Sequence, residues 1–152
     1  MALIYSENPK ASFDYEILDK YEAGIELTGP EAKSIKTNGI SLKSAYVRIM
    51  SNGSVLLINS HISKYKPAFS AQTHYDPERS RNLLLHKREV IKLFGKVKER
   101  GLTIIPLKVY LKGKFIKIEI GLAKGKKLYD KRESIKKRDV ERDMKRELRG
   151  KL

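Results

Sequence analysis

Short alternations of apolar and polar residues fill much of the first half of the chain and predict β-strands. Ser12–Leu18 and Ala23–Leu27 each alternate in the way typical of a strand with one buried face. Asn52-Gly53 lies between two apolar runs, residues 46–49 and 55–58. Because Asn-Gly suits the tightest hairpin turns, this segment predicts an antiparallel hairpin.

A second hairpin is predicted further along the chain. The apolar runs Thr103–Leu111 and Phe115–Leu122 flank a turn at Lys112-Gly113-Lys114. Pro106 lies inside the first run, and proline cannot donate a hydrogen bond to a neighbouring strand. We therefore expect an edge strand or a bulge at Pro106.

Three segments carry helix signals. Gly29-Pro30-Glu31 opens a short helix that ends at Asn38-Gly39, and Asp76-Pro77-Glu78 resembles a cap with a first helical turn. Lys87–Arg100 is the clearest helix, because its apolar residues share one face and Gly101 follows as a stop. Residues 64–75 have no clean period and predict a long, functional loop, whereas residues 83–85 form a short buried segment.

About six antiparallel strands with two or three flanking helices predict a mainly β fold. The five-stranded Greek-key OB barrel, or a close variant, is the first choice, and an open antiparallel α+β sheet is the alternative. A length of 152 residues fits one domain. We place the barrel with its helices in residues 1–123 and a separate tail in residues 124–152.

The tail differs in character from the barrel. Val140, Met144, Leu148 and Leu152 recur at every fourth residue and make one narrow apolar stripe on an otherwise charged helix. A helix with so little apolar surface is marginal in isolation, so we expect it to order on a charged partner. A helix docked permanently on the barrel is the alternative.

Charge is distributed unevenly along the chain. The net charge of +15 divides into −1 for residues 1–63, +9 for residues 64–123 and +7 for residues 124–152. A concentrated positive surface attracts polyanions, and RNA or DNA gains affinity from each phosphate that is neutralised. An anionic membrane surface and a merely lysine-rich surface are the competing interpretations.

Several kinds of site are disfavoured. Zero cysteines exclude disulfides and thiolate-bound zinc, and His61, His74 and His86 lie too far apart for a helical metal pair. The segment Gly121–Lys127 lacks the spacing and the Ser/Thr of a phosphate-binding loop, and no catalytic triad motif occurs. We therefore expect no enzymatic activity, no metal and no cofactor. No apolar run approaches the roughly 18 residues of a membrane span and no signal-peptide pattern opens the chain, which predicts a cytoplasmic protein.

Binding features are better represented. Basic residues cluster around residues 79–88 and 124–132, and tyrosines offer rings on which unpaired bases could stack. Most of these tyrosines are expected to be half-buried in the barrel.

Five separated motifs stand out along the chain: Asn8–Ala11, Tyr21–Ile25, Leu27–Ser34, Asp76–Lys87 and Gly121–Arg132. Taken together, they resemble the small protein B family, the SsrA-binding proteins of bacterial ribosome rescue. The resemblance implies an OB-type barrel without catalytic activity. It implies binding to the tRNA-like domain of transfer-messenger RNA (tmRNA), delivered by elongation factor Tu with GTP to stalled 70S ribosomes. The tail would then enter the empty mRNA channel near the decoding centre and contact 16S rRNA, with no role for DNA or membranes.

The resemblance also implies site residues. For the tRNA-like domain these are Asn8, Glu22, Glu31, Lys33, Ser34, Arg79, Arg81, Leu84, Lys87, Lys124, Lys126 and Lys127. For the ribosome they are Tyr129, Asp130, Lys131, Arg132, Lys136, Lys137, Arg138, Met144 and Leu148. Arg79, Arg81 and Lys87 would contact phosphates. A carboxylate facing RNA, such as that of Glu22, would accept hydrogen bonds from base amino groups or a 2′-hydroxyl. A hydrogen bond within the barrel is the alternative role for Glu22, and a structural ribosome component is the alternative to a rescue adaptor.

Overall fold

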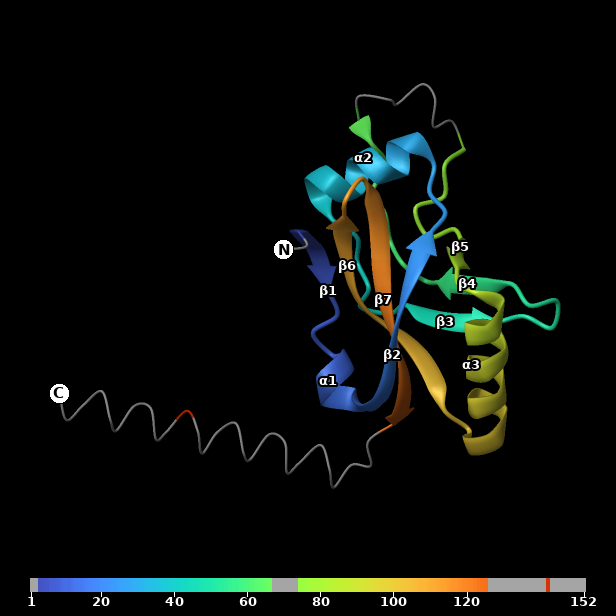
Figure 1. Ribbon diagram of the computed structural model, residues 1–152. Coiled ribbons are helices and arrows are strands. Elements are labelled where there is room, and N and C mark those ends of the chain that lie inside the picture. Colours follow the sequence, from blue (N-terminus) through green and yellow to red (C-terminus); the bar gives the residue numbers. More distant parts are fainter. Residues whose placement is uncertain (1–2, 67–73, 126–141, 143–152) are drawn as a thin grey trace, which may run out of the picture.

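Seven strands and three helices make up the part of the chain that the computed structural model describes, which is residues 3–66, 74–125 and 142. Figure 1 shows their arrangement. In chain order they are β1 (Leu3–Glu7), α1 (Ala11–Asp14), β2 (Tyr15–Ile25), α2 (Gly29–Asn38), β3 (Tyr46–Ile49), β4 (Val55–Ile58), β5 (Arg81–Leu84), α3 (Lys87–Arg100), β6 (Thr103–Lys112) and β7 (Phe115–Gly125).

Six of these strands close into a ring of antiparallel pairs. Around the ring the order is β6, β3, β4, β5, β2 and β7, and β7 returns to β6. The remaining strand, β1, pairs with the end of β6 that β3 leaves open, because β3 meets β6 only at Ile104 and β1 meets it from Lys108 to Leu111. This barrel-like, mainly β arrangement confirms the predicted fold class.

The longest pairings join β7 to β6 on one side and to β2 on the other. Each contains a bulge, at Pro106/Lys108 in β6 and at Ile17/Asp19 in β2. The bulge predicted at Pro106 is therefore confirmed, and it leaves the Pro106 carbonyl free to accept a hydrogen bond from the Asn8 side chain (3.0 Å). Bulges of this kind increase strand curvature, which helps a sheet to close.

The helices α2 and α3 end at glycines, as their sequences predict. Gly39 follows α2 with a φ of 76°, and Gly101 follows α3 in the left-handed conformation with a φ of 60°. Figure 1 shows α2 across one end of the ring and α3 beside β3. None of the helices within residues 3–66 and 74–125 is long and apolar enough to span a membrane.

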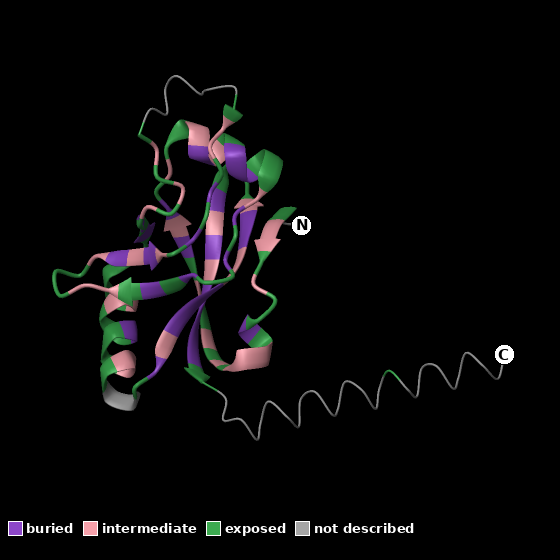
Figure 2. Cartoon of the chain, turned by 180° about the vertical axis from the view of Figure 1, so that it is seen from behind, coloured by how far each residue is buried: buried purple, intermediate pink, exposed green. Residues whose placement is uncertain are grey.

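One apolar core fills the ring and extends beneath both of these helices. Leu57, Ile62, Leu93, Val109 and Ile118 have no exposed surface and come from β4, the segment after it, α3, β6 and β7. Figure 2 shows that buried residues concentrate along the strands. Because Leu93 packs into this core, α3 is fixed to the barrel by its apolar face.

Four local predictions differ from the structure. In the segment 83–85, which is predicted to be buried, Leu84 is exposed because alternate residues of β5 face outward. Residues 12–14 are helical, and the two strands expected between Ser12 and Leu27 form the single strand β2. Asp76-Pro77-Glu78 makes a turn rather than a helix, because the chain continues directly into β5. The strand β7 continues to Gly125, two residues past the predicted end of the barrel. The tail and its stripe lie outside the described residues, apart from Arg142.

Candidate nucleic-acid interface

The outer face of β5, β2, β7 and β6 brings together residues that are distant in the sequence. Cross-strand register places Leu84, Gly24, Lys117 and Tyr110 in one row, one residue from each strand. Residues directly opposite each other on neighbouring strands lie on the same side of a sheet. We call this surface the outer β-face, and it also carries Lys108, Lys112, Phe115, Glu119 and Glu22.

Gly24 and Leu84 fit together at one edge of the outer β-face. A Cβ atom on Gly24 would lie 3.3 Å from the Cβ of Leu84, which is closer than most side chains approach. The absence of a side chain at position 24 lets Leu84 lie across β2, and the leucine remains exposed. The predicted site residue Leu84 is therefore an exposed apolar side chain that packs over the backbone of Gly24.

Glu22 occupies the middle of the outer β-face. Its carboxylate accepts hydrogen bonds from the Tyr110 hydroxyl and from Lys112 Nζ (3.1 Å). The Tyr110 hydrogen bond, with help from Lys112, holds the pKa of Glu22 below its ordinary value even though partial burial opposes this. Burial and the Glu22 carboxylate raise the pKa of Tyr110.

Glu22 is therefore ionised and accepts hydrogen bonds from two barrel side chains, in agreement with the alternative prediction that its role is a hydrogen bond within the barrel. Its side chain also keeps 37% of its surface exposed. A carboxylate has about four acceptor sites, so the two hydrogen bonds leave capacity for an outside donor.

Phe115 is a feature of the outer β-face that the sequence analysis missed. It begins β7 at the tip of the β6–β7 hairpin and has 68% of its surface exposed. It pairs in register with Lys112, and Lys117 Nζ lies 5.8 Å from the centre of its ring. An exposed ring among lysines can stack on an unpaired base while the lysines meet phosphates. The signal in the sequence is Lys112-Gly113-Lys114-Phe115, an aromatic residue directly after a basic turn.

Glu31 belongs to a separate, buried cluster. Its N–H donates to Thr28 Oγ1 (3.3 Å), and its own carboxylate accepts from the Thr28 N–H (3.0 Å), which caps the start of α2. The same carboxylate accepts from Arg79, from Arg81 Nη2 (2.7 Å) and from the Tyr75 hydroxyl (3.1 Å). Glu31 therefore ties α2 to β5 and to the turn before it.

The arginines of this cluster differ in exposure. Arg81 is completely buried and donates to Glu31, Ser60, Tyr75 and Pro77. Arg81 therefore has no exposed surface with which to contact a phosphate, as the resemblance implies it would, because all of its guanidinium nitrogens donate hydrogen bonds inside the protein. Arg79 stays about one-third exposed while it pairs with Glu31.

Burial by itself would raise the pKa of Glu31. Hydrogen bonds from Arg79, the Thr28 N–H and Arg81 outweigh it and lower the pKa to about 2. Burial, with the charge of Glu31, raises the pKa of Tyr75 to about 12. The cluster is thus a charged network with all of its buried side-chain groups paired, and it fixes the base of the turn that presents Arg79.

The remaining predicted residues are spread over the barrel. Lys33 is exposed with Nζ 5.9 Å from the Tyr65 ring, whereas Ser34 is buried and donates to the Ser63 carbonyl (2.6 Å). Asn8 links the start of α1 to β6. Lys87 and Lys124 are exposed at the start of α3 and near the end of β7.

Lys126, Lys127 and all nine residues expected to contact the ribosome lie outside the described residues. Within residues 3–66 and 74–125, no group of three or more histidine or acidic side chains is placed to hold a metal ion.

Comparison with known proteins identifies the family to which the chain belongs. Residues 5–150 match the family described as SmpB protein. The chain belongs to the SmpB family. Relatives described as SsrA-binding protein include one from Carboxydothermus hydrogenoformans, 51% identical over 99% of both chains. Another, from Persephonella marina, is 51% identical over 98% of this chain and 96% of the relative.

A solved SmpB-family structure resembles the fold described above. It is described as "tmRNA-SmpB: a journey to the center of the bacterial ribosome". It is 42% identical to this chain with a TM-score of 0.65, and the match covers 81% of this chain and 85% of the other. The predicted family and its fold are therefore confirmed.

Proposed function

We propose that this chain is an SsrA-binding protein, a non-catalytic adaptor that binds tmRNA and acts with it on stalled ribosomes in trans-translation. The names of its relatives and its full-length match to the SmpB family support this assignment. The observation that carries it in the structure is the outer β-face, where an exposed leucine, an exposed phenylalanine and an acceptor carboxylate lie among lysines.

On this proposal the outer β-face binds the tRNA-like domain. Phe115 stacks on an unpaired base, the free lone pairs of Glu22 accept from a base amino group or a 2′-hydroxyl, and Leu84 packs against a sugar or base. Lys108, Lys112 and Lys117 meet neighbouring phosphates. Further phosphate contacts are Arg79, Lys33, Lys87 and Lys124. The buried residues Glu31 and Arg81 hold Arg79 in position.

The tail completes the proposed function. Residues 128–152 would enter the empty mRNA channel of the small ribosomal subunit, with Tyr129–Arg132, Lys136–Arg138, Met144 and Leu148 as contacts to 16S rRNA near the decoding centre. Elongation factor Tu with GTP would take part indirectly, by carrying the alanylated RNA. A cytoplasmic location follows from this role.

We expect a chain that ends at Lys127 to bind the tRNA-like domain with nearly the affinity of the full chain, because β7 stays intact to its last paired residue and Lys126 and Lys127 are retained. The same chain should fail to support transfer of the nascent peptide to alanyl-tmRNA on stalled ribosomes. Gel-shift titration and a reconstituted peptidyl-transfer assay measure the two properties separately. Equal loss of both would contradict the division between barrel and tail.

Isolation of the full chain from cells, followed by sequencing of the bound RNA, tests the assignment itself. Recovery of one dominant tmRNA is the expected result. Stoichiometric recovery with washed, translating ribosomes would instead make the chain a structural ribosome component.

A further inference from the structure

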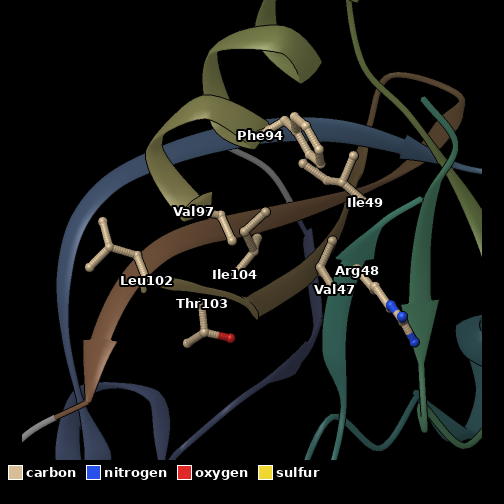
Figure 3. A pocket seen from close by; sticks show the side chains of 8 residues that line it. All are labelled: Val47, Arg48, Ile49, Phe94, Val97, Leu102, Thr103 and Ile104. Carbon is tan, nitrogen blue, oxygen red and sulfur yellow. The ribbon is translucent and has the colours of Figure 1, made fainter. Parts of the chain in front are cut away.

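An apolar groove runs between α3 and the β3–β4 hairpin, away from the outer β-face. It consists of two adjoining cavities of about 240 and 210 Å³, which share Ile49 and Phe94. Figure 3 shows the first cavity, where Phe94 and Val97 of α3 face Ile49 of β3 and Ile104 of β6. The second continues along α3 past Val90 and Ile91 to Met50 and Gly53 in the hairpin turn.

The groove is too small and too open for a small-molecule site and suits two protruding side chains instead. Pockets for small ligands measure about 300–1,000 Å³ in one enclosed space, whereas the volume here is divided between two open cavities that are each smaller. Ile91, with 64% of its surface exposed, and Phe94 form the part of the helix that faces outward beside the cavities. An amphipathic helix inserts side chains spaced three or four residues apart into grooves of this kind.

The surroundings of the groove are positively charged. Lys87, Ile91, Phe94 and Lys98 follow one stripe along α3, so a lysine lies at each end, and Lys98 Nζ lies 4.9 Å from the Phe94 ring. Arg48 lines the groove on the β3 side, but its guanidinium points away from Phe94 and Ile49 (Figure 3), and none of the lining residues of either cavity is acidic. An occupant with acidic residues beside its apolar ones would therefore complement this rim.

The charge of the rim disfavours two other occupants, and the apolar floor disfavours a third. The chain's own residues 124–152 carry a net charge of +7 and a second copy of the chain carries +15, so both would be repelled by the rim. RNA would meet a floor of aliphatic side chains from Ile49, Met50, Val90, Val97, Leu102 and Ile104, with only Arg48, Ser51 and Thr103 as polar lining side chains. Base recognition needs rings and hydrogen-bonding groups. Among the lining residues only Phe94 supplies a ring, and with 36% of its surface exposed it is less accessible to a base than Phe115, which has 68% exposed.

We propose that the groove between α3 and the β3–β4 hairpin docks an acidic amphipathic helix of a partner protein. Two apolar side chains of that helix enter the two cavities, and its acidic residues lie near Lys87 and Lys98. The groove lies on a different part of the barrel from the outer β-face, and Lys87 is the residue that it shares with the phosphate contacts proposed above.

A fluorescent 15-residue peptide tests the groove on the full chain. The probe has leucines at positions i, i+4 and i+7 of a helix and glutamates on the other faces, and a scrambled peptide of the same composition is its control. We expect the scrambled peptide to bind at least about tenfold more weakly, because apolar contacts in register and not charge alone hold the probe.

Ile91→Gln, an exposed substitution without change of charge, should weaken probe binding about tenfold and leave the affinity for the tRNA-like domain unchanged. Leu18→Gln, at an exposed leucine of β2 outside the groove, is the matched control and should change probe affinity less than twofold. Thermal unfolding of both variants should match that of the unmodified chain, since both positions are exposed.

Equal binding of the probe and the scrambled peptide, or equal affinity of Ile91→Gln and the unmodified chain for the probe, would overturn the proposal. Displacement of the probe by a tRNA-like RNA, together with weaker RNA binding by Ile91→Gln, would assign the groove to nucleic acid instead. The two results obtained with the peptides alone do not depend on whether the chain binds tmRNA, so the groove can fail while the proposed function stands.

Discussion

Replacing Glu31 by glutamine is expected to lower the free energy of unfolding by about 3–5 kcal/mol at neutral pH, because it removes the only charge that neutralises the buried Arg81 guanidinium within its cluster. The loss is a large fraction of the 5–15 kcal/mol that stabilises an ordinary domain. Urea unfolding followed by circular dichroism measures it.

The pH dependence should change together with the stability. The pKa of Glu31 is about 2 in the folded chain and 4.5 ordinarily, so its carboxylate contributes fully above pH 4.5 and loses that contribution as the pH falls through 2. A difference of this size corresponds to about 3 kcal/mol. The unmodified chain should lose this amount over that window, and Glu31→Gln should lack this part of the transition.

Glu26→Gln is the matched control for Glu31→Gln. Glu26 is exposed on the strand side of the same connection and accepts one hydrogen bond from Asn82 (3.0 Å). Its replacement should change the free energy of unfolding by less than about 0.5 kcal/mol. If Glu31→Gln were no more destabilising than Glu26→Gln, the buried cluster would not hold α2 to β5.

Phe115→Ala should weaken binding to the tRNA-like domain about tenfold to a hundredfold, since stacking of one base on an aromatic ring contributes about 1–3 kcal/mol. The dependence of affinity on salt should stay the same, because no charge is removed. Lys117→Gln, at the neighbouring lysine, should instead reduce the slope of log affinity against log salt by about 1. Fluorescence anisotropy over a series of salt concentrations separates these two effects.

Phe115→Trp gives a direct readout of stacking. The chain contains no tryptophan, so this variant has a single indole at the hairpin tip. Its affinity should be close to that of the unmodified chain, and its emission should be quenched when RNA binds. Binding without quenching would place Phe115 outside the interface while leaving RNA binding itself intact.

The sequence predicts those elements whose signals are local. The Asn52-Gly53 hairpin, the helix Lys87–Arg100 and the bulge at Pro106 each depend on a few adjacent residues, and each is confirmed. The strand β1 was missed because its five residues show no strict alternation, and it is held by register with β6. The sequence predicts two strands, Ser12–Leu18 and Ala23–Leu27, yet β2 runs through residues 19–22 between them because alternate residues of this strand face outward.

The site could be predicted only in part, for the same reason. Family resemblance selected Glu22 and Leu84, but only cross-strand register puts them on one face. Glu31 and Arg81 are 50 residues apart in the sequence, and no periodicity of apolar or polar residues predicts that they pair. Phe115 follows a basic turn, which is a weak signal in the sequence, and only the structure shows that its ring is exposed at the hairpin tip.

The strand β7 connects the proposed RNA-binding surface of the barrel to the start of the tail. Phe115 begins it and Gly125, where the described barrel ends, is its last residue, still paired with Tyr15. Ten steps of about 3.3 Å place these two points about 33 Å apart. Because β7 is bonded on both sides, it acts as a rigid spacer that sets how far the tail begins from the stacked base. A change in its length would alter the reach of the tail even if every contact residue stayed the same.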